Sequence, residues 1–246
     1  MLRSAPVPVV AFVLAVLLPA GSAWAGPWPR AEDGVFISLS VEQDRDDNRY
    51  TGLYTEYGLS PRNTLGLEVG HTDGEVSTML WWQRALDRGE GPNRLTVSAG
   101  IGAIQRDGKL HPVVQMGSAW GRGFDSLPVL RRVPGGGWLA VDTRFKLAGV
   151  TQDIDFGPNV IADQTSYLTP ESTAKAELTL GWHATQALML INQFRFEDRQ
   201  DSGFSSKLAI SAVHDIFGPA SLELGVIEPL SGPGETAFKL GTWLEF

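Results

Sequence analysis

An acidic segment, Asp44-Arg45-Asp46-Asp47-Asn48, has oxygen-bearing side chains at the first, third and fifth positions of the spacing that calcium-binding loops use. Such a loop also needs a glycine at its sixth position, for a sharp turn, and a glutamate at its twelfth, as a bidentate ligand. Here those positions are Arg49 and Thr55. We therefore expect a solvated acidic loop and no metal site.

The four histidines are the natural candidates for acid–base chemistry, but their neighbours do not strengthen that interpretation. His71 precedes Thr72 and Asp73, and His214 precedes Asp215. A neighbouring His and Asp are weak evidence, because the members of a catalytic triad meet in space and not in sequence. The chain has no cysteine, which excludes a thiol nucleophile, a thiolate metal site and a disulfide. We expect no catalytic residue and no cofactor.

Most other charged residues fall at every second position of segments whose remaining residues are apolar. Over residues 139–147, for example, Leu, Val, Thr, Phe and Leu alternate with Ala, Asp, Arg and Lys. Successive side chains of a β-strand point to opposite faces, so this pattern predicts strands with one apolar and one polar face. About twelve such runs follow one another. Their approximate spans are 34–42, 49–59, 63–72, 75–85, 93–105, 111–122, 137–148, 173–182, 186–197, 203–214, 219–228 and 235–246.

The length of these runs favours a membrane barrel over a soluble sandwich, which would also have one apolar face. Most runs reach the roughly 9–11 residues that a tilted membrane strand needs, whereas soluble strands are commonly about 5–6 residues long. A sheet in lipid has no water to satisfy its edges, so it must close on itself. We predict an all-β, up-and-down antiparallel transmembrane barrel of about twelve strands, or ten if two runs are misread.

Loop lengths and aromatic positions orient this barrel. The connections 42–48, 149–172 and 197–202 are long or polar and are expected outside, whereas 59–63, 183–185 and 216–219 are short and are expected in the periplasm. The long connection 124–136 breaks this rule and makes the register near 111–136 the least secure. On the apolar face, aromatic residues predict two interfacial girdles, with Tyr57, Trp82, Trp182 and Phe246 at the periplasmic ends of their strands and Phe194, Phe204 and Phe238 at the external ends.

The first 25 residues have the features of a cleaved signal peptide. Arg3 supplies the positive start, residues 9–18 form a short apolar run, and Ala23-Trp24-Ala25 is a small-x-small cleavage site. Cleavage would leave 26–33 as a short periplasmic N-terminal segment and 34–246 as the barrel. The 246 residues carry a formal charge of −8, which argues against nucleic-acid binding.

The chain ends with alternating Phe238, Leu240, Thr242, Leu244 and Phe246. This run resembles the closing strand of bacterial outer-membrane barrel proteins, whose terminal aromatic residue is read by the barrel-assembly machinery. The resemblance implies a Gram-negative outer-membrane location, lipid and the assembly machinery as partners, and Phe246 as the assembly signal. A monomer is expected.

The face opposite the apolar one would line the lumen, and its charges are of both signs. The lumen-lining candidates are Glu56, Glu68, Arg144, Lys146, Lys175, Glu177, Arg195, Lys207, Glu223 and Lys239. These residues could border a narrow passive path for small solutes, or they could pair and close the lumen of a structural or surface-recognition barrel. A strand number near twelve does not choose between the two.

The chain is more similar to channel-type barrels than to barrel enzymes. Outer-membrane phospholipases have a closely spaced His-x-Ser pair, and none of the four histidines here is followed by such a serine. The omptin-type proteases need external acidic pairs with an Asp-His pair, and no such assembly is evident. The segment 149–172 could fold inward as a constriction or remain outside as a lid, and an external loop is the default.

Overall fold

The computed structural model describes residues 26–88, 91–133, 135–153 and 166–246, so the predicted signal peptide lies outside the described residues. The described residues form twelve β-strands and two short 3-10 helices, Phe124–Ser126 and Leu130–Arg132. None of the helices in this part of the chain is long and apolar enough to cross a membrane. The strands are β1 (Val35–Asp44), β2 (Arg49–Ser60), β3 (Asn63–His71), β4 (Glu75–Ala85), β5 (Asn93–Arg106), β6 (Lys109–Gly123), β7 (Gly137–Asp153), β8 (Ser166–His183), β9 (Leu188–Arg199), β10 (Gly203–Phe217), β11 (Ala220–Ser231) and β12 (Ala237–Glu245).

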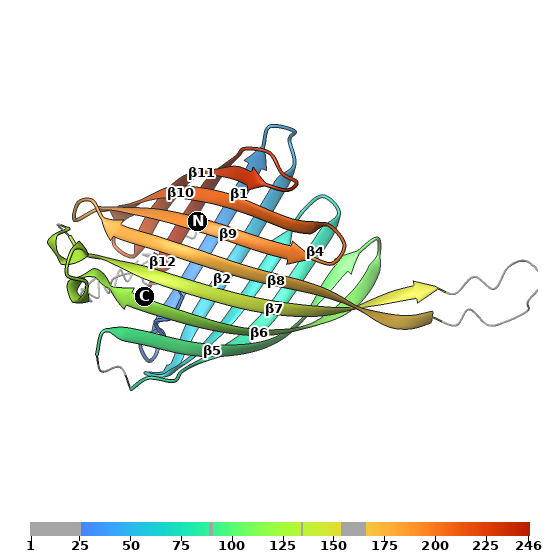
Figure 1. Ribbon diagram of the computed structural model, residues 1–246, viewed down its shortest axis with the longest axis horizontal. Helices are drawn as coiled ribbons and strands as arrows, with labels where there is room; N and C mark the ends of the chain where they lie inside the picture. The colour runs from blue at the N-terminus through green and yellow to red at the C-terminus, as the bar shows by residue number, and fades with distance from the viewer. Residues whose placement is uncertain (1–25, 89–90, 134, 154–165) are drawn as a thin grey trace, which may run out of the picture.

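Each strand pairs antiparallel with its neighbours in sequence, and β1 pairs with β12, so the sheet is a closed barrel (Figure 1). Val35 and Phe246 complete the closure by exchanging two backbone hydrogen bonds of 2.9 Å. Closure pairs the edges that an open sheet would expose to lipid. The predicted fold class and strand number are confirmed, and every predicted run overlaps one strand, including β6, where the register was least secure.

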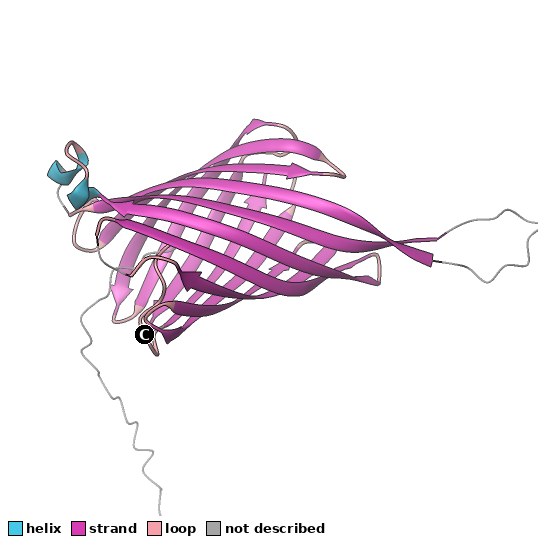
Figure 2. Ribbon diagram, turned by 60° about the horizontal axis from the view of Figure 1, so that its bottom comes forward, coloured by secondary structure: helices cyan, strands magenta, loops and turns pink. Residues whose placement is uncertain are grey.

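The two ends of the barrel differ, and we name them by what lies there. At the terminus end, β1 begins, β12 ends, and the two 3-10 helices occupy the connection between β6 and β7 (Figure 2). At the hairpin end, β7 and β8 continue beyond the rest of the wall as a paired, twisted ribbon (Figure 1).

That ribbon corrects the prediction of a loop over 149–172. Residues 149–153 of β7 pair with residues 166–170 of β8, and the β-branched and aromatic residues Val150, Thr151, Tyr167 and Thr169, which favour strands, extend past the expected strand ends. The described part of the segment points away from the barrel and does not fold into it (Figure 1). Residues 154–165 lie outside the described residues.

The connection between β5 and β6 shows how local sequence sets register. Asp107 and Gly108 both have positive φ, 51° and 74°, and Arg106 pairs directly with Lys109. A two-residue hairpin turn of this type needs positive φ at both central positions, which Asp and Gly tolerate best. The connections at 45–48 and 72–74, also at the hairpin end, are short as well. Among the described residues, the connections at the hairpin end are therefore not clearly longer than those at the terminus end, although the sequence predicted longer external loops.

Burial follows the predicted period of two along the strands. On β5 and β6, the outward Ile101 and Met116 are 66% and 68% exposed, whereas the inward Thr96 and Val113 are 1% and 2% exposed. Large apolar side chains on the outside of a closed sheet indicate a lipid-facing belt. Of the predicted girdle residues, Trp182 is half-buried, and the exposed ones are Tyr57, Trp82, Phe194, Phe204, Phe238 and Phe246.

Candidate functional site: the interior of the barrel

Two arginines reach across the interior to carboxylates on distant strands. Arg144 Nη1 on β7 lies 3.6 Å from Glu68 Oε2 on β3, and three strands separate β3 from β7. Arg195 Nη1 on β9 lies 3.6 Å from Glu42 Oε1 on β1, again with three strands between them. Strands so far apart can be joined only through the lumen. The two pairs therefore narrow it.

Further ion pairs join neighbouring positions on the same inner face. Lys175 Nζ on β8 lies 3.0 Å from Glu197 Oε2 on β9, and Arg144 Nε donates to Asp142 Oδ1 at 2.8 Å. All these side chains are about a quarter to a third exposed. They meet water as well as each other, which limits the energy of each pair.

A second group of charges lies nearer the terminus end and is more deeply buried. Lys239 Nζ on β12 lies 2.8 Å from Glu223 Oε1 on β11, and Trp243 Nε1 donates to the other oxygen of Glu223 at 3.0 Å. Each oxygen of the Glu223 carboxylate therefore has a partner, as a carboxylate that is only 2% exposed requires.

The inner face carries all the predicted lumen-lining residues, but in different settings. Of those without an ion pair described above, Lys146, Glu177 and Lys207 are half-buried at the same inward parity as their paired neighbours. Glu56 is 5% exposed and accepts hydrogen bonds from Tyr54 Oη and Arg30 Nε, so it belongs to a buried cluster at the terminus end.

Two cavities border the central ion pairs. The larger, about 340 Å³, opens at the hairpin end, and Glu42, Tyr50 and Lys207 are part of its lining. The smaller, about 150 Å³, lies between Tyr50, Tyr54, Glu68 and Arg144. Since Tyr50 lines both, they follow one another from the hairpin end towards the Arg144–Glu68 pair. A cavity of this size with several polar partners can hold water.

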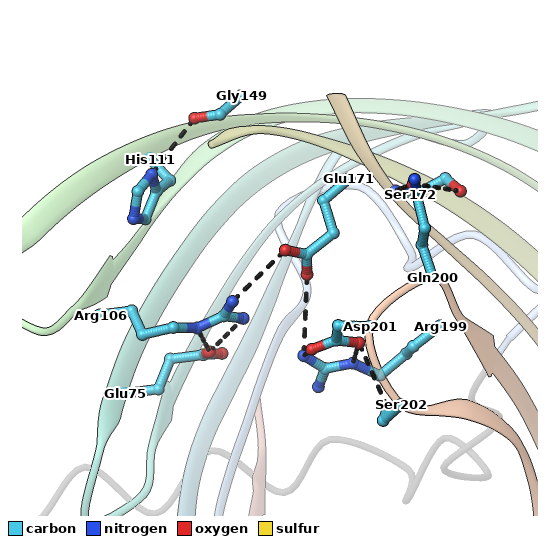
Figure 3. A network of polar contacts seen from close by, with 10 residues as sticks. All are labelled: Glu75, Arg106, His111, Gly149, Glu171, Ser172, Arg199, Gln200, Asp201 and Ser202. Atoms are coloured by element: carbon cyan, nitrogen blue, oxygen red, sulfur yellow. Dashed lines mark hydrogen bonds and ion pairs between the residues drawn. The ribbon is translucent and has the colours of Figure 1, made fainter. Parts of the chain in front are cut away.

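A network of alternating charges lies at the hairpin end (Figure 3). Arg106 Nη2 on β5 is 2.8 Å from Glu75 Oε2 on β4, and its Nη1 is 3.4 Å from Glu171 Oε2 on β8. The other oxygen of Glu171 is 3.9 Å from Arg199 Nη2 on β9, and Arg199 donates two hydrogen bonds, of 3.0 and 2.9 Å, to Asp201. The network ties β4 and β5 to β8 and β9 on the inner side of β6 and β7.

Arg199 also explains the acidity of its partner. Because the Arg199 guanidinium donates hydrogen bonds to the Asp201 carboxylate in the turn between β9 and β10, the pKa of Asp201 lies below its usual value. Sequence reasoning did not single out this network, since its members come from four strands. The one signal in the sequence is that Arg106, Glu171 and Arg199 each occupy a position on the polar face of its strand.

Residues 26–33, which the sequence predicted only as a periplasmic segment, contact the inner wall at the terminus end. Arg30 is 7% exposed and was also missed, because no periodic pattern covers it. Within the described residues, no group of three or more His, Asp or Glu side chains is placed to hold a metal ion.

Comparison with known proteins shows likeness of fold without likeness of sequence. No family model and no curated protein matches the chain. NanC porin is similar with a TM-score of 0.57 and 9% identity over 86% of this chain and 100% of that one. KdgM porin gives 0.55 and 8% over 86% and 99%, and an outer membrane channel from Pseudomonas putida F1 gives 0.58 and 10% over 91% and 99%. The described residues of the chain form a closed twelve-strand barrel, and this fold is similar to that of the two porins and the outer-membrane channel.

Proposed function

We propose that this chain is an outer-membrane barrel that forms a narrow passive channel for small solutes. The observation that carries the proposal is the polar interior, where Arg144 meets Glu68 across the lumen beside a cavity of about 150 Å³. Ion pairs across the lumen are also expected of a closed structural barrel, so the open space beside them is what favours a path: the cavity of about 150 Å³ lies next to the Arg144–Glu68 pair, and one of about 340 Å³ opens at the hairpin end. The fold shared with the NanC and KdgM porins supports the same function.

In this proposal the terminus end faces the periplasm and the hairpin end faces the outside. The apolar belt lies in lipid, the girdle residues border its two edges, and Phe246 ends the strand that the assembly machinery reads. Residues 1–25 would direct export. The channel would work as a monomer without a catalytic step or a cofactor, since each barrel encloses its own lumen.

Selectivity would come from the paired charges. Arg144 and Arg195 attract anions while Glu42 and Glu68 attract cations, and the two pairs add no net charge to the part of the lumen that they cross. Such an interior favours small polar or zwitterionic solutes over highly charged ones. Because the arginines reach across the lumen, they would also reduce the width of the path at this level.

The test is single-channel recording of the full mature chain in a planar bilayer. We expect stepwise conductance that is small for a twelve-strand barrel, with weak preference between potassium and chloride. Complete absence of steps from protein that shows the heat-modifiable gel mobility of a folded barrel would favour the alternative, a closed structural or surface-recognition barrel.

A further inference from the structure

Residues 26–33 precede the first strand, and we call them the N-terminal segment. Residues 26–30 lie inside the barrel, although nothing in their sequence predicts it, and the exposed residues 31–33 lead into β1. Pro27 is almost completely buried and Arg30 is 7% exposed, values that belong to the inside of a fold and not to a free tail. Asp33 N donates to Gly58 O at 2.9 Å and leads the chain from this segment into β1.

Arg30 binds one side of the segment to the neighbouring strands of the barrel. Its Nε donates to Glu56 on β2, and its Nη1 donates to Glu245 Oε1 on β12 at 3.0 Å. Its guanidinium carbon lies 4.4 Å from the centre of the Phe36 ring on β1, and its backbone N–H donates to Thr64 Oγ1 on β3 at 3.0 Å. An arginine so deeply buried is stable only when it is paired with carboxylates, as here.

The other side of the segment meets the opposite wall. Trp28 packs against the apolar cluster of Trp138 on β7, Met189 and Ile191 on β9 and Val213 on β10, together with Ala140. Gln83 Nε2 on β4 donates to Gly26 O at 3.0 Å. The segment therefore contacts strands on all sides of the barrel and crosses its opening at the terminus end.

One wall position has no side chain where the segment approaches most closely. A Cβ built on Gly121 of β6 would lie 2.3 Å from Pro27 Cγ and 2.5 Å from the Trp28 ring, closer than non-bonded atoms allow. Gly121 does not have a positive φ, so the reason for glycine here is space and not backbone conformation. The wall and the segment are matched in shape.

We propose that the N-terminal segment is a plug that narrows the periplasmic mouth and sets the size limit of the channel at that end. This inference rests on the proposed function. It assigns Arg30, through its bonds to Glu56 and Glu245, as the residue that holds the plug in place, and Trp28 as the side chain that fills the opening. Small solutes pass beside the segment, and larger ones pass only when it is displaced.

The first experiment locates the plug without measuring transport. The chain has no cysteine, so the double substitution Gly26→Cys and Ala140→Cys introduces the only two thiols. A Cβ on Gly26 would lie 4.0 Å from the Cβ of Ala140 on β7, a separation that a disulfide can span. Mild oxidation should therefore form a disulfide that removes both thiols from maleimide labelling in denaturant and that reduction restores. The single variant Gly26→Cys is the control and should remain labelled. Failure of the folded double variant to cross-link would overturn the plug.

The second experiment measures what the plug does. Releasing it with Arg30→Gln should raise the single-channel conductance severalfold and admit larger neutral solutes in liposome swelling. Arg62→Gln makes the same charge change in the exposed turn between β2 and β3 at the same end and should behave as wild type. The cross-linked double variant should stay at low conductance. Heat-modifiable mobility verifies that each variant is folded.

The results separate the plug from the channel. Conductance that is the same in wild type, Arg30→Gln and the cross-linked and reduced double variant would overturn the plug and leave the channel intact. A lack of conductance in every folded variant would overturn the channel and, with it, the role of the plug in setting its size.

Discussion

Removing the charge of Arg144 should make the channel more selective for cations. The Arg144 guanidinium reaches to within 3.6 Å of Glu68 from the opposite side, so an ion that crosses this level must pass close to it. Arg144→Gln keeps a polar side chain, although a shorter one, and leaves Asp142 and Glu68 without that positive partner. The change widens the path and makes its electrostatic potential more negative, and only the second effect favours cations over anions.

The size of the effect follows from Coulomb's law. A unit charge about 6 Å from a passing monovalent ion contributes about 0.7 kcal/mol in water, which screening at 0.1 M salt reduces to about 0.4 kcal/mol. Loss of the charge favours cations and disfavours anions by this amount, about 0.8 kcal/mol in total, so the ratio of cation to anion permeability should rise about fourfold. Low-dielectric walls would increase this value.

The assay is the reversal potential across a gradient of potassium chloride, compared between wild type and Arg144→Gln. The matched control is Arg45→Gln, which removes the same charge from the exposed turn between β1 and β2. The shift should shrink in concentrated salt, because the screening length falls to about 3 Å at 1 M. An unchanged reversal potential, or an equal shift in Arg45→Gln, would show that ions do not pass Arg144.

Three other predictions concern the wall, a turn and the charge network. Ile101→Arg places a charge near the middle of the outward face of β5 and should destabilise the folded barrel by about 2–4 kcal/mol in denaturant titrations, whereas Ile101→Leu should not. Gly108→Val forces a β-branched residue into positive φ and should cost about 1–2 kcal/mol in the same titration; an unchanged midpoint would contradict the assigned turn. Arg199→Gln should raise the pKa of Asp201 towards about 3.9, measured by NMR of its carboxyl carbon. Because the wild-type pKa is lowered, the stabilisation from this pair is present above the unfolded-state pKa and is lost as pH falls through the folded-state value; identical titrations in the two proteins would refute the assignment.

The sequence by itself determined the strands and their faces, because a period of two is a local property. Residues 139–147 show which side chains of β7 are apolar whether or not the partner strands are known. The Asp107-Gly108 turn likewise sets the pairing of β5 with β6 through backbone conformation at two residues. A closed barrel then followed from the absence of water for strand edges in lipid.

Only the tertiary structure decided which charges meet and what fills the mouth. The contacts of Arg144 with Glu68 and of Arg195 with Glu42 depend on the curvature and stagger of the closed sheet, which bring strands with three others between them within reach of one side chain. The N-terminal segment has no periodicity to reveal its position, since its residues are held by individual contacts with many strands. Local pattern cannot encode such long-range contacts, and they become defined only when the barrel closes.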